Sequence, residues 1–252
     1  MTEEEIQARV LHRDGLMLVI DKPAGLPVHR GPKGGASLED YFDALRFGLP
    51  RAPALAHRLD KETSGCLVLG RHRKALATLG KLFKDGRVGK TYWAVTEGGP
   101  AEDEGRIELP LGRRDDTRGW WMKADPDGQP AATRWKVLGR CSGFPASADR
   151  EAGTRVELHH GRKLAWLALE PLTGRTHQLR VHCAAMGWPI VGDAIYGAAP
   201  RQDGPPLHLH AREIVVPLYK NREPVRAMAP VPLHMQERLY ACGWRGEVYT
   251  LV

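Results

Sequence analysis

The sequence predicts an α+β fold with a mixed, mainly antiparallel central sheet flanked by helices and loops. Short apolar or alternating runs with the length of strands recur along most of the chain. Only a few segments have the apolar spacing of a helix. Strands and helices do not alternate in the regular way that marks a parallel α/β sheet, so antiparallel pairing is expected to dominate.

The expected strands are short and end at glycine, proline or polar residues. The first is the continuous apolar run 16–20, which the segment 21–25 ends because proline removes a backbone donor and glycine permits a turn. Further strands are expected at 66–69, 92–95, 107–109, 133–138, 154–158, 164–169, 207–216 and 247–252. The segment 141–153 is expected to be a surface loop.

Three segments have helical spacing. Ser37 is expected to begin the first helix, with Asp40 completing an approximate capping box. The second is expected at 72–84, where apolar residues share one side and Gly86 ends the helix. The third is expected at 175–186, with Leu179, Cys183 and Met186 facing the core.

Length and composition describe an ordinary soluble globular protein. The 252 residues allow one large domain or two small ones, and the apolar and charged fractions, 42% and 27%, are unremarkable. The net charge of +7 and the pI near 9.4 favour a polyanionic partner. Nucleic acid is the first candidate and a membrane surface the second.

The cysteines indicate a reducing compartment. None of the four forms a C-x-x-C pair, so we expect free thiols, with neither a disulfide framework nor a zinc site. The first residues are acidic and lack the apolar core of a signal peptide, and the apolar runs are too short to span a bilayer. We therefore expect a cytoplasmic protein without a membrane partner.

Positive charge is concentrated in the segment 71–90. Seven basic residues occur there against Asp85 alone: Arg71, Arg73, Lys74, Lys81, Lys84, Arg87 and Lys90. A solvated helix face is one interpretation of this run. A site for the backbone of RNA or DNA is the other.

The segment 57–65, with the sequence HRLDKETSG, is the most informative part of the chain. It places Asp60 directly after an alternating run and directly before a turn, between Arg58 and Lys61. Nearby positive charge is expected to keep such an acid ionised. The alternative is an aspartate that only opens a turn.

Other segments give Asp60 a context. They are KTYWA at 90–94, TGRTHQLRVH at 173–182, GWPIVGDAIYG at 187–197 and DKPAG at 21–25. With HRLD at 57–60, they closely resemble the RluA family of pseudouridine synthases. The resemblance covers residues 10–235 and depends on several ordered motifs, which makes it more specific than any single match.

The resemblance implies the pseudouridine synthase fold, with an active-site cleft across the sheet and a single catalytic domain over residues 1–252. It also implies the isomerisation of uridine in RNA to pseudouridine. In that reaction the bond from nitrogen to the sugar is cut, the uracil turns, and a bond to carbon 5 is made. No cofactor or metal is expected.

The resemblance also assigns site residues. Asp60 would be the catalytic aspartate, attacking the ribose or the base or assisting the bond break. Tyr92 would pack against the target base and help remove the proton from carbon 5. Arg180 would pair with Asp60 and hold it ionised and aimed. The side chains expected to contact RNA are Arg58, His57, Lys61, Lys81, Lys84, Arg87, Lys90, Arg175 and His177.

Each assignment has a structural alternative. Tyr92 can be a strand aromatic that packs the sheet, and Arg180 a surface cation on a helix. His177 and His182 can suggest a metal pair, although packing is the better interpretation because no third ligand is evident. Asp193 is expected to bond backbone groups. Trp120 and Trp121 fit either stacking on RNA bases or covering the core.

The resemblance fits the compact members of the family. Only 15 residues precede the strand at 16–20, so we expect no additional N-terminal RNA-binding module. Compact members resembling RluA itself modify an accessible stem-loop in ribosomal RNA, transfer RNA or both, and we expect a monomer. Two rival functions remain, a non-catalytic RNA-binding or ribosome-assembly factor on this scaffold and a carboxylate glycosidase. A glycosidase usually needs two acids beside one sugar, and only one is convincingly placed.

Overall fold

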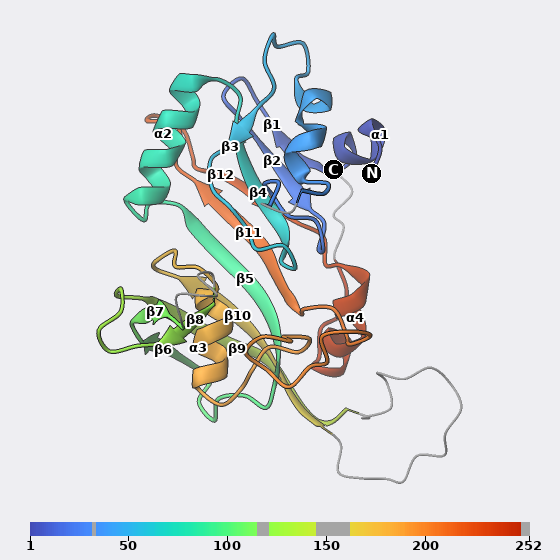
Figure 1. Ribbon diagram of the computed structural model, residues 1–252, viewed down its shortest axis with the longest axis vertical. Helices are drawn as coiled ribbons and strands as arrows, with labels where there is room; N and C mark the ends of the chain where they lie inside the picture. Colours follow the sequence, from blue (N-terminus) through green and yellow to red (C-terminus); the bar gives the residue numbers. More distant parts are fainter. Residues whose placement is uncertain (32–33, 115–120, 145–161, 248–252) are drawn as a thin grey trace. The chain divides into compact units, whose positions relative to one another are not determined.

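The computed structural model describes residues 1–31, 34–114, 121–144 and 162–247 (Figure 1). The chain divides into two compact units, and each consists of two separate segments of the sequence. The first unit contains Met1–Thr91 and His210–Pro230, and the second contains Tyr92–Leu209 and Val231–Val252. Strand β5 (Gly89–Glu97) begins in the first unit and continues into the second.

The first unit is built around a sheet with one parallel pairing. Its elements are α1 (Glu3–Gln7), β1 (Val10–Arg13), β2 (Met17–Lys22), the 3-10 helix η1 (Leu38–Leu45), β3 (Ala54–Leu55), β4 (Ser64–Gly70), α2 (Arg73–Lys84), β11 (Leu209–Val216) and β12 (Val225–Met228). The pairings β1–β2, β2–β4, β3–β4 and β11–β12 are antiparallel, and β4–β11 is parallel.

Strands β2 and β4 form the centre of this unit. Every residue of β4 is buried, and so are the first four of β2. A strand covered on both faces has a continuous apolar run instead of alternation, which explains the pattern at 16–20. At the start of β4, Gly65 has φ +103°, and a Cβ there would lie 2.3 Å from the carbonyl oxygen of Ala211. Only glycine permits this close approach of β11.

The helices of the first unit begin where the sequence predicts. Ser37 and Asp40 form the expected capping box, although the segment that follows is a 3-10 helix and not an α-helix. Helix α2 begins after His72, whose Nδ1 accepts a hydrogen bond from Ala75 N at 3.3 Å. Its buried side consists of Ala75, Leu79 and Leu82.

The second unit is a fully antiparallel arrangement of long strands. Its remaining elements are β6 (Glu104–Glu108), β7 (Leu111–Arg113), β8 (Met122–Ala124), β9 (Ala132–Phe144), β10 (Arg162–Pro171), α3 (Gln178–Ala185) and α4 (Leu233–Ala241). The strand order β5–β10–β9–β6 is antiparallel throughout, and β7 pairs with β8 separately. Antiparallel pairing therefore dominates both units, which confirms the predicted α+β class.

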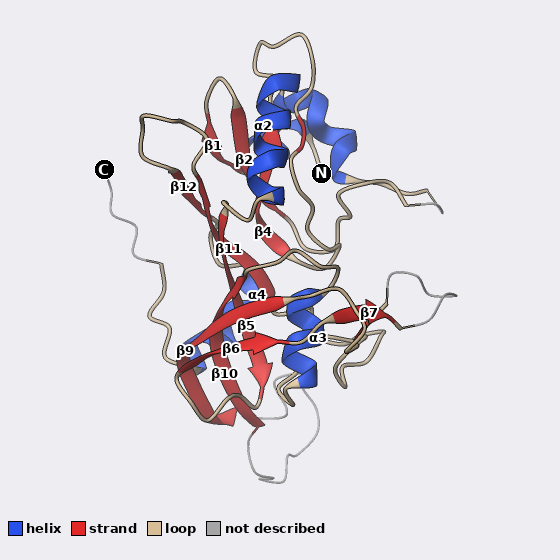
Figure 2. Ribbon diagram, turned by 90° about the vertical axis from the view of Figure 1, so that its left-hand side faces the viewer, coloured by secondary structure: helices blue, strands red, loops and turns tan. Residues whose placement is uncertain are grey.

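Helices α3 and α4 belong to the second unit (Figure 2). Two apolar clusters pack them on its strands. One cluster joins Leu179 and Cys183 of α3 to Leu167 and Leu169 of β10. The other joins Met235 and Leu239 of α4 to the strands. Leu179 and Cys183 thus face the core as predicted. The expectation that Met186 also faces the core was wrong, because it follows the last turn of α3 and is 47% exposed.

Some predicted boundaries were wrong. Strand β9 continues to Phe144, so the expected surface loop cannot begin at 141, because pairing with β10 holds these residues in the sheet. Helix α3 begins at Gln178 instead of 175, because His177 adopts the left-handed conformation with φ +52°. The sequence analysis did not predict α4, which follows Pro232. The strand expected at 154–158, the loop 145–153 and positions 248–252 lie outside the described residues.

Candidate active site

Asp60 lies in the turn between β3 and β4, in the first unit. Its carbonyl oxygen accepts a hydrogen bond from Thr63 N at 3.1 Å, and its side chain is half-buried. The predicted turn is therefore present. It leads directly into the buried start of β4, which fixes the backbone on the C-terminal side of the acid.

A buried lysine fixes the other side of this turn. Lys22, fully buried at the end of β2, donates from Nζ to the carbonyl oxygens of Pro23, Leu26 and Lys61 at 2.8, 2.8 and 2.9 Å. Gly25 N also donates to the Lys61 carbonyl at 2.9 Å. The DKPAG segment and the Asp60 turn are thus joined through one ammonium group. The sequence analysis missed this role, although a lysine at the end of an apolar strand was a signal.

The charge of Lys22 depends on its surroundings. Burial lowers the pKa of Lys22 to about 8, and the negative charges of Glu62, Asp60 and Asp21 partly oppose that decrease. The ammonium therefore remains charged at neutral pH. A full positive charge lies beneath the turn that carries Asp60.

His57 has a structural contact within the first unit. Its Nε2 accepts a hydrogen bond from Val68 N at 3.0 Å, and its ring stacks on Phe83 at 4.3 Å. Burial, with a smaller contribution from the charge of Lys90, lowers the pKa of His57 to about 3. The imidazole is neutral at physiological pH. Contact between His57 and RNA stays a prediction, and it cannot depend on a charge.

The basic segment 71–90 divides into buried and exposed parts. Arg71 donates to the carbonyl oxygens of Asp14 at 2.6 Å and Arg46 at 3.0 Å, so it joins loops of the first unit. Burial lowers the pKa of Lys90, which is half-buried. The exposed basic side chains of this region are Arg58, Lys61, Arg73, Lys74, Lys81, Lys84 and Arg87. These remain available to a polyanion.

Tyr92 lies on β5, opposite Leu169 of β10. Its half-buried ring packs against the apolar cluster that includes Leu167 and Leu179. Tyr92 therefore packs against the sheet, as the structural alternative in the sequence analysis describes. A catalytic role for Tyr92 stays a prediction.

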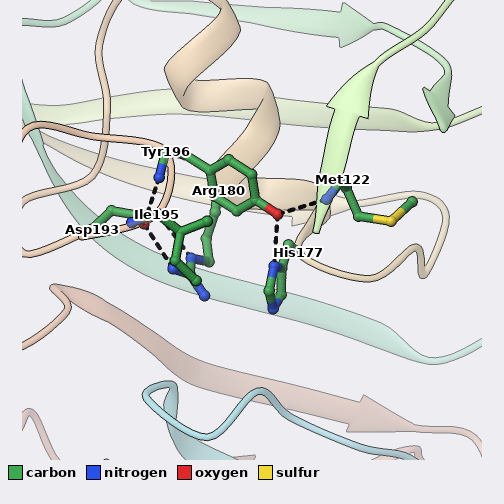
Figure 3. A network of polar contacts seen from close by, with 6 residues as sticks. All are labelled: Met122, His177, Arg180, Asp193, Ile195 and Tyr196. Atoms are coloured by element: carbon green, nitrogen blue, oxygen red, sulfur yellow. Dashed lines mark hydrogen bonds and ion pairs between the residues drawn. The ribbon is translucent and has the colours of Figure 1, made fainter. Parts of the chain in front are cut away.

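Arg180 on α3 is buried and paired. Its side chain is 5% exposed, which excludes the alternative of a surface cation. Nε lies 2.8 Å from Oδ2 of Asp193, and Nη2 lies 2.7 Å from Oδ1 (Figure 3). This bidentate geometry holds the guanidinium plane in one orientation. The sequence analysis proposed Asp60 as a partner and did not identify Asp193.

Asp193 accepts further hydrogen bonds from the backbone. Its Oδ1 receives Ile195 N at 2.9 Å and Tyr196 N at 3.0 Å, which confirms the expectation that it bonds backbone groups. Burial acts to raise the pKa of Asp193. The hydrogen bonds and charge of Arg180, together with the two backbone N–H groups, outweigh burial, so the pKa lies below its usual range. Asp193 is therefore a buried anion.

Tyr196 completes this network. Its hydroxyl oxygen accepts from Met122 N at 2.9 Å and lies 2.8 Å from Nδ1 of His177 (Figure 3). Its ring centroid lies 5.3 Å from Cζ of Arg180, within the range of a cation–π contact. One side chain thus joins strand β8, the residue before α3 and the guanidinium.

The remaining candidates of the second unit have local contacts. Arg175 is exposed and donates from Nε to the Pro130 carbonyl at 3.1 Å. His182 is fully buried between Thr133 and the Leu109 carbonyl. No group of three or more potential metal ligands occurs among the described residues. Trp121 is buried, which favours its interpretation as a core cover, and Trp120 lies outside the described residues.

The candidate residues therefore belong to two separate sets. Asp60, with Lys22 beneath its turn, is in the first unit. Tyr92 and Arg180 are in the second. Each set is ordered by its own contacts, and the convergence of the three side chains stays a prediction.

Comparisons with known proteins agree with these motifs. Residues 16–185 match the family model described as RNA pseudouridylate synthase. An uncharacterised RNA pseudouridine synthase of Zymomonas mobilis is 41% identical over 226 residues, which cover 89% of this chain and 94% of that protein. An uncharacterised RNA pseudouridine synthase of Synechocystis is 32% identical over 248 residues, covering 94% of this chain and 69% of that protein.

A solved structure supports the same relationship. Human RNA pseudouridylate synthase domain containing 4 superposes with a TM-score of 0.72 at 28% identity, covering 95% of each chain. Within the described part of this chain, no helix has the length and apolar character needed to cross a membrane.

Proposed function

The chain belongs to the RNA pseudouridylate synthase family and is an isomerase, and we propose that it converts a specific uridine of ribosomal RNA, transfer RNA or both into pseudouridine with Asp60 as the catalytic aspartate. The observation that carries the assignment of Asp60 is its place in an ordered turn, joined to the DKPAG segment through Lys22. A reacting carboxylate needs a fixed backbone and nearby positive charge.

The chemistry assigned to Asp60 needs an ionised acid. A carboxylate can attack the base or the ribose, and it can also assist the break of the bond from the base nitrogen to the sugar. Lys22 supplies positive charge beneath the turn, and its pKa of about 8 keeps it protonated at neutral pH. In our proposal, Arg180 supplies a second positive charge.

We also propose a role for Tyr92. The target uridine must leave its stack before any side chain reaches it, and an aromatic ring supports an extruded base. Tyr92 would pack against that base and help remove the proton from carbon 5. Its place on a long antiparallel strand would give the ring a rigid support.

RNA would contact the exposed basic side chains. We assign the phosphate contacts to Arg58 and Lys61 beside Asp60, and to Lys81, Lys84 and Arg87 at the end of α2. The four cysteines are free, which favours action in the cytoplasm. We also propose that the protein acts as a monomer.

The test is the formation of pseudouridine in RNA by the purified protein. Mapping new pseudouridines in total RNA, after incubation and in cells with and without the protein, would identify the substrate. Asp60→Asn should lower the rate by at least about 10³-fold, as loss of a reacting group does in other enzymes. RNA affinity should change little.

Asp43→Asn is the matched control, since Asp43 is an exposed aspartate paired with Arg46 in the same unit. It should retain full activity. Retention of RNA without isomerisation by the unmodified protein would instead indicate a binding factor. Comparable activity of Asp60→Asn would remove this residue from the mechanism.

A further inference from the structure

Arg175, shortly before α3 in the second unit, is fixed at its backbone and at Nε. Gln178 contacts both backbone polar groups of Arg175: its side-chain Oε1 accepts from Arg175 N at 3.1 Å, and its own N donates to the Arg175 carbonyl at 3.2 Å. Arg175 Nε donates to the Pro130 carbonyl at 3.1 Å. Within the described part of the chain, the Nη1 and Nη2 groups of this exposed side chain form no hydrogen bond or ion pair. A guanidinium held at its stem therefore presents its terminal donors to solvent.

We propose that Arg175 forms a phosphate site for the substrate RNA and that Gln178 and Thr173 are its positioning residues. A guanidinium can bind phosphate through two parallel N–H groups, and the two Nη groups of Arg175 supply the donors for that contact. This inference rests on the proposed function only in taking RNA as the substrate. All the contacts that order the site lie within the second unit.

The side-chain amide of Gln178 can take only one orientation. Its Oε1 accepts from Arg175 N and from the Thr173 hydroxyl, the latter at 2.6 Å. Its Nε2 donates to the Ala132 carbonyl at 2.9 Å and to the Thr133 hydroxyl at 3.0 Å. Turning the amide over would bring N–H against N–H at Arg175 and oxygen against oxygen at Ala132. All four hydrogen-bonding positions of this buried amide are thus filled in one way.

Thr173 joins the same loop to the sheet. Its hydroxyl donates to Gln178 Oε1 and accepts from Ala132 N at 3.1 Å. The two residues that flank the segment 174–177 therefore contact each other and the first residue of β9. Arg175 lies within this closed loop, so its backbone is held in a fixed position beside β9.

The network continues into α3 through Thr133 and His182. Because the Thr133 hydroxyl already accepts from Gln178, its proton is directed to Nδ1 of His182, 2.9 Å away. The ring then carries its one proton on Nε2, which donates to the Leu109 carbonyl at 3.0 Å. Burial lowers the pKa of His182, which agrees with this neutral form. The loop of Arg175 is therefore connected to a buried set of hydrogen bonds on β9 and α3.

A cap for α3 is the structural alternative, and the contacts of Gln178 do not fit it. A helix cap satisfies the first N–H groups of the helix. The residue before α3, His177, makes no side-chain capping hydrogen bond. The Gln178 side chain instead accepts from Arg175 N, which precedes the helix. This amide therefore orders the loop that carries Arg175, and not the end of the helix.

The experiment is a double-mutant cycle on RNA affinity, measured with a labelled RNA stem-loop that contains uridine. Arg175→Gln should weaken binding about 10-fold, because a charged hydrogen bond to phosphate is lost. It should also reduce the slope of log affinity against log salt by about 0.7–0.9. Gln178→Met should weaken binding about 5-fold, because RNA must then immobilise the Arg175 side chain. In the Arg175→Gln background, Gln178→Met should have almost no further effect.

Thr173 allows a conservative test of the same network. Thr173→Ala loses the hydroxyl and should weaken binding about 3-fold, whereas Thr173→Ser keeps it and should match the unmodified protein. The controls are Gln236→Met and Arg134→Gln. Gln236 on α4 also donates to a backbone carbonyl, that of Val231, and Arg134 is an exposed arginine on β9. Both variants should bind RNA like the unmodified protein.

The outcomes separate this inference from the proposed function. Absence of pseudouridine formation would overturn the proposed function, while the salt slope still tests the phosphate site, because it measures binding and not turnover. An active protein in which Arg175→Gln leaves the salt slope unchanged would overturn the phosphate site. Additive effects of Gln178→Met and Arg175→Gln would overturn the positioning role. If Gln178→Met does not fold, the two Thr173 variants decide, since serine retains the hydroxyl that alanine removes.

Discussion

Lys22 connects two segments that are far apart in the sequence. Its ammonium donates to carbonyl groups on both the DKPAG segment and the Asp60 turn, 39 positions away along the chain. Three carbonyl acceptors match the three N–H donors of an ammonium group. A single residue therefore controls the position of the backbone beneath Asp60.

Replacing Lys22 with methionine should damage both stability and activity. Methionine fills a similar volume but removes the Lys22 hydrogen bonds to the Pro23 and Leu26 carbonyl groups and one of the two hydrogen bonds to the Lys61 carbonyl. This loss should lower the free energy of unfolding by about 1–3 kcal/mol. The single-turnover rate should fall more than the RNA affinity, because the Asp60 turn loses its support. Denaturant unfolding and a rate assay measure the two effects.

Lys136→Met is the control for this prediction, since Lys136 is exposed on β9. It should leave stability and rate unchanged. Full activity of Lys22→Met at a temperature where it is folded would show that the Asp60 turn does not depend on this contact.

At the scale of elements, helix α2 has two distinct sides. Its buried side holds the helix on the first unit through Ala75, Leu79 and Leu82. The opposite side and the turn that follows present Lys81, Lys84 and Arg87 to solvent. Within the described part of the chain these three side chains form no hydrogen bond or ion pair, so their charges can be removed without disturbing the packing of the helix.

The triple replacement of Lys81, Lys84 and Arg87 by glutamine should therefore weaken RNA binding selectively. Each phosphate contact that is lost should reduce the slope of log affinity against log salt by about 0.7–0.9. Affinity measured between 50 and 200 mM salt tests this expectation. Lys123, Lys136 and Lys163 provide a triple control at exposed positions of the second unit. An unchanged salt slope would move the RNA path away from α2.

Elements were predictable from the sequence to the extent that local patterns determined them. The apolar run of β2, the capping box at Ser37 and the amphipathic spacing of α2 each identify an element. The end of β9 was not predictable, because Gly139 and Gly143 disfavour a strand and are held there by pairing with β10. The late start of α3 depends on the left-handed conformation of His177, which no local pattern indicates.

The same distinction applies to the candidate site. The motifs gave Asp60, Tyr92 and Arg180 as candidates, because residue type and spacing can be read from the sequence, and their roles stay predictions. The partnership of Arg180 with Asp193 was not predictable, since it depends on the tertiary position of the turn after Gly192. The sequence analysis assigned Asp193 only its backbone contacts.

At the scale of the whole molecule, buried histidines make stability depend on pH. His57 in the first unit and His208 in the second both have a pKa lowered to about 3, mainly by burial. Unfolded histidine takes up a proton near pH 6.5, so the unfolded state binds more protons between pH 6.5 and 3. Stability is therefore full above pH 6.5 and declines as the pH falls through this window.

Asp21 opposes this trend in part. Burial raises the pKa of Asp21 to about 6, against the attraction of Arg9 and Lys22. The folded state therefore binds the extra proton between pH 6 and 3.8, which stabilises it on acidification by about 1 kcal/mol at pH 5. Each histidine contributes a loss of about 2 kcal/mol over the same change, so the net effect is destabilisation.

His208→Gln should reduce the pH dependence of unfolding. Glutamine can accept the hydrogen bond from Arg238 but cannot take up a proton. Between pH 7 and 5, the variant should lose about 2 kcal/mol less of unfolding free energy than the unmodified protein. Denaturant unfolding at the two pH values measures the difference. His29→Gln, at an exposed histidine, should behave like the unmodified protein.

The parallel pairing of β4 with β11 has a consequence during synthesis. Ser64 and His210 are 146 positions apart, so a nascent chain carries a finished β4 long before its neighbour leaves the ribosome. At about 5–20 residues per second, that wait lasts about 7–30 seconds. During that time the edge of β4 that pairs with β11 in the folded protein lacks its partner, and an unpaired strand edge favours aggregation.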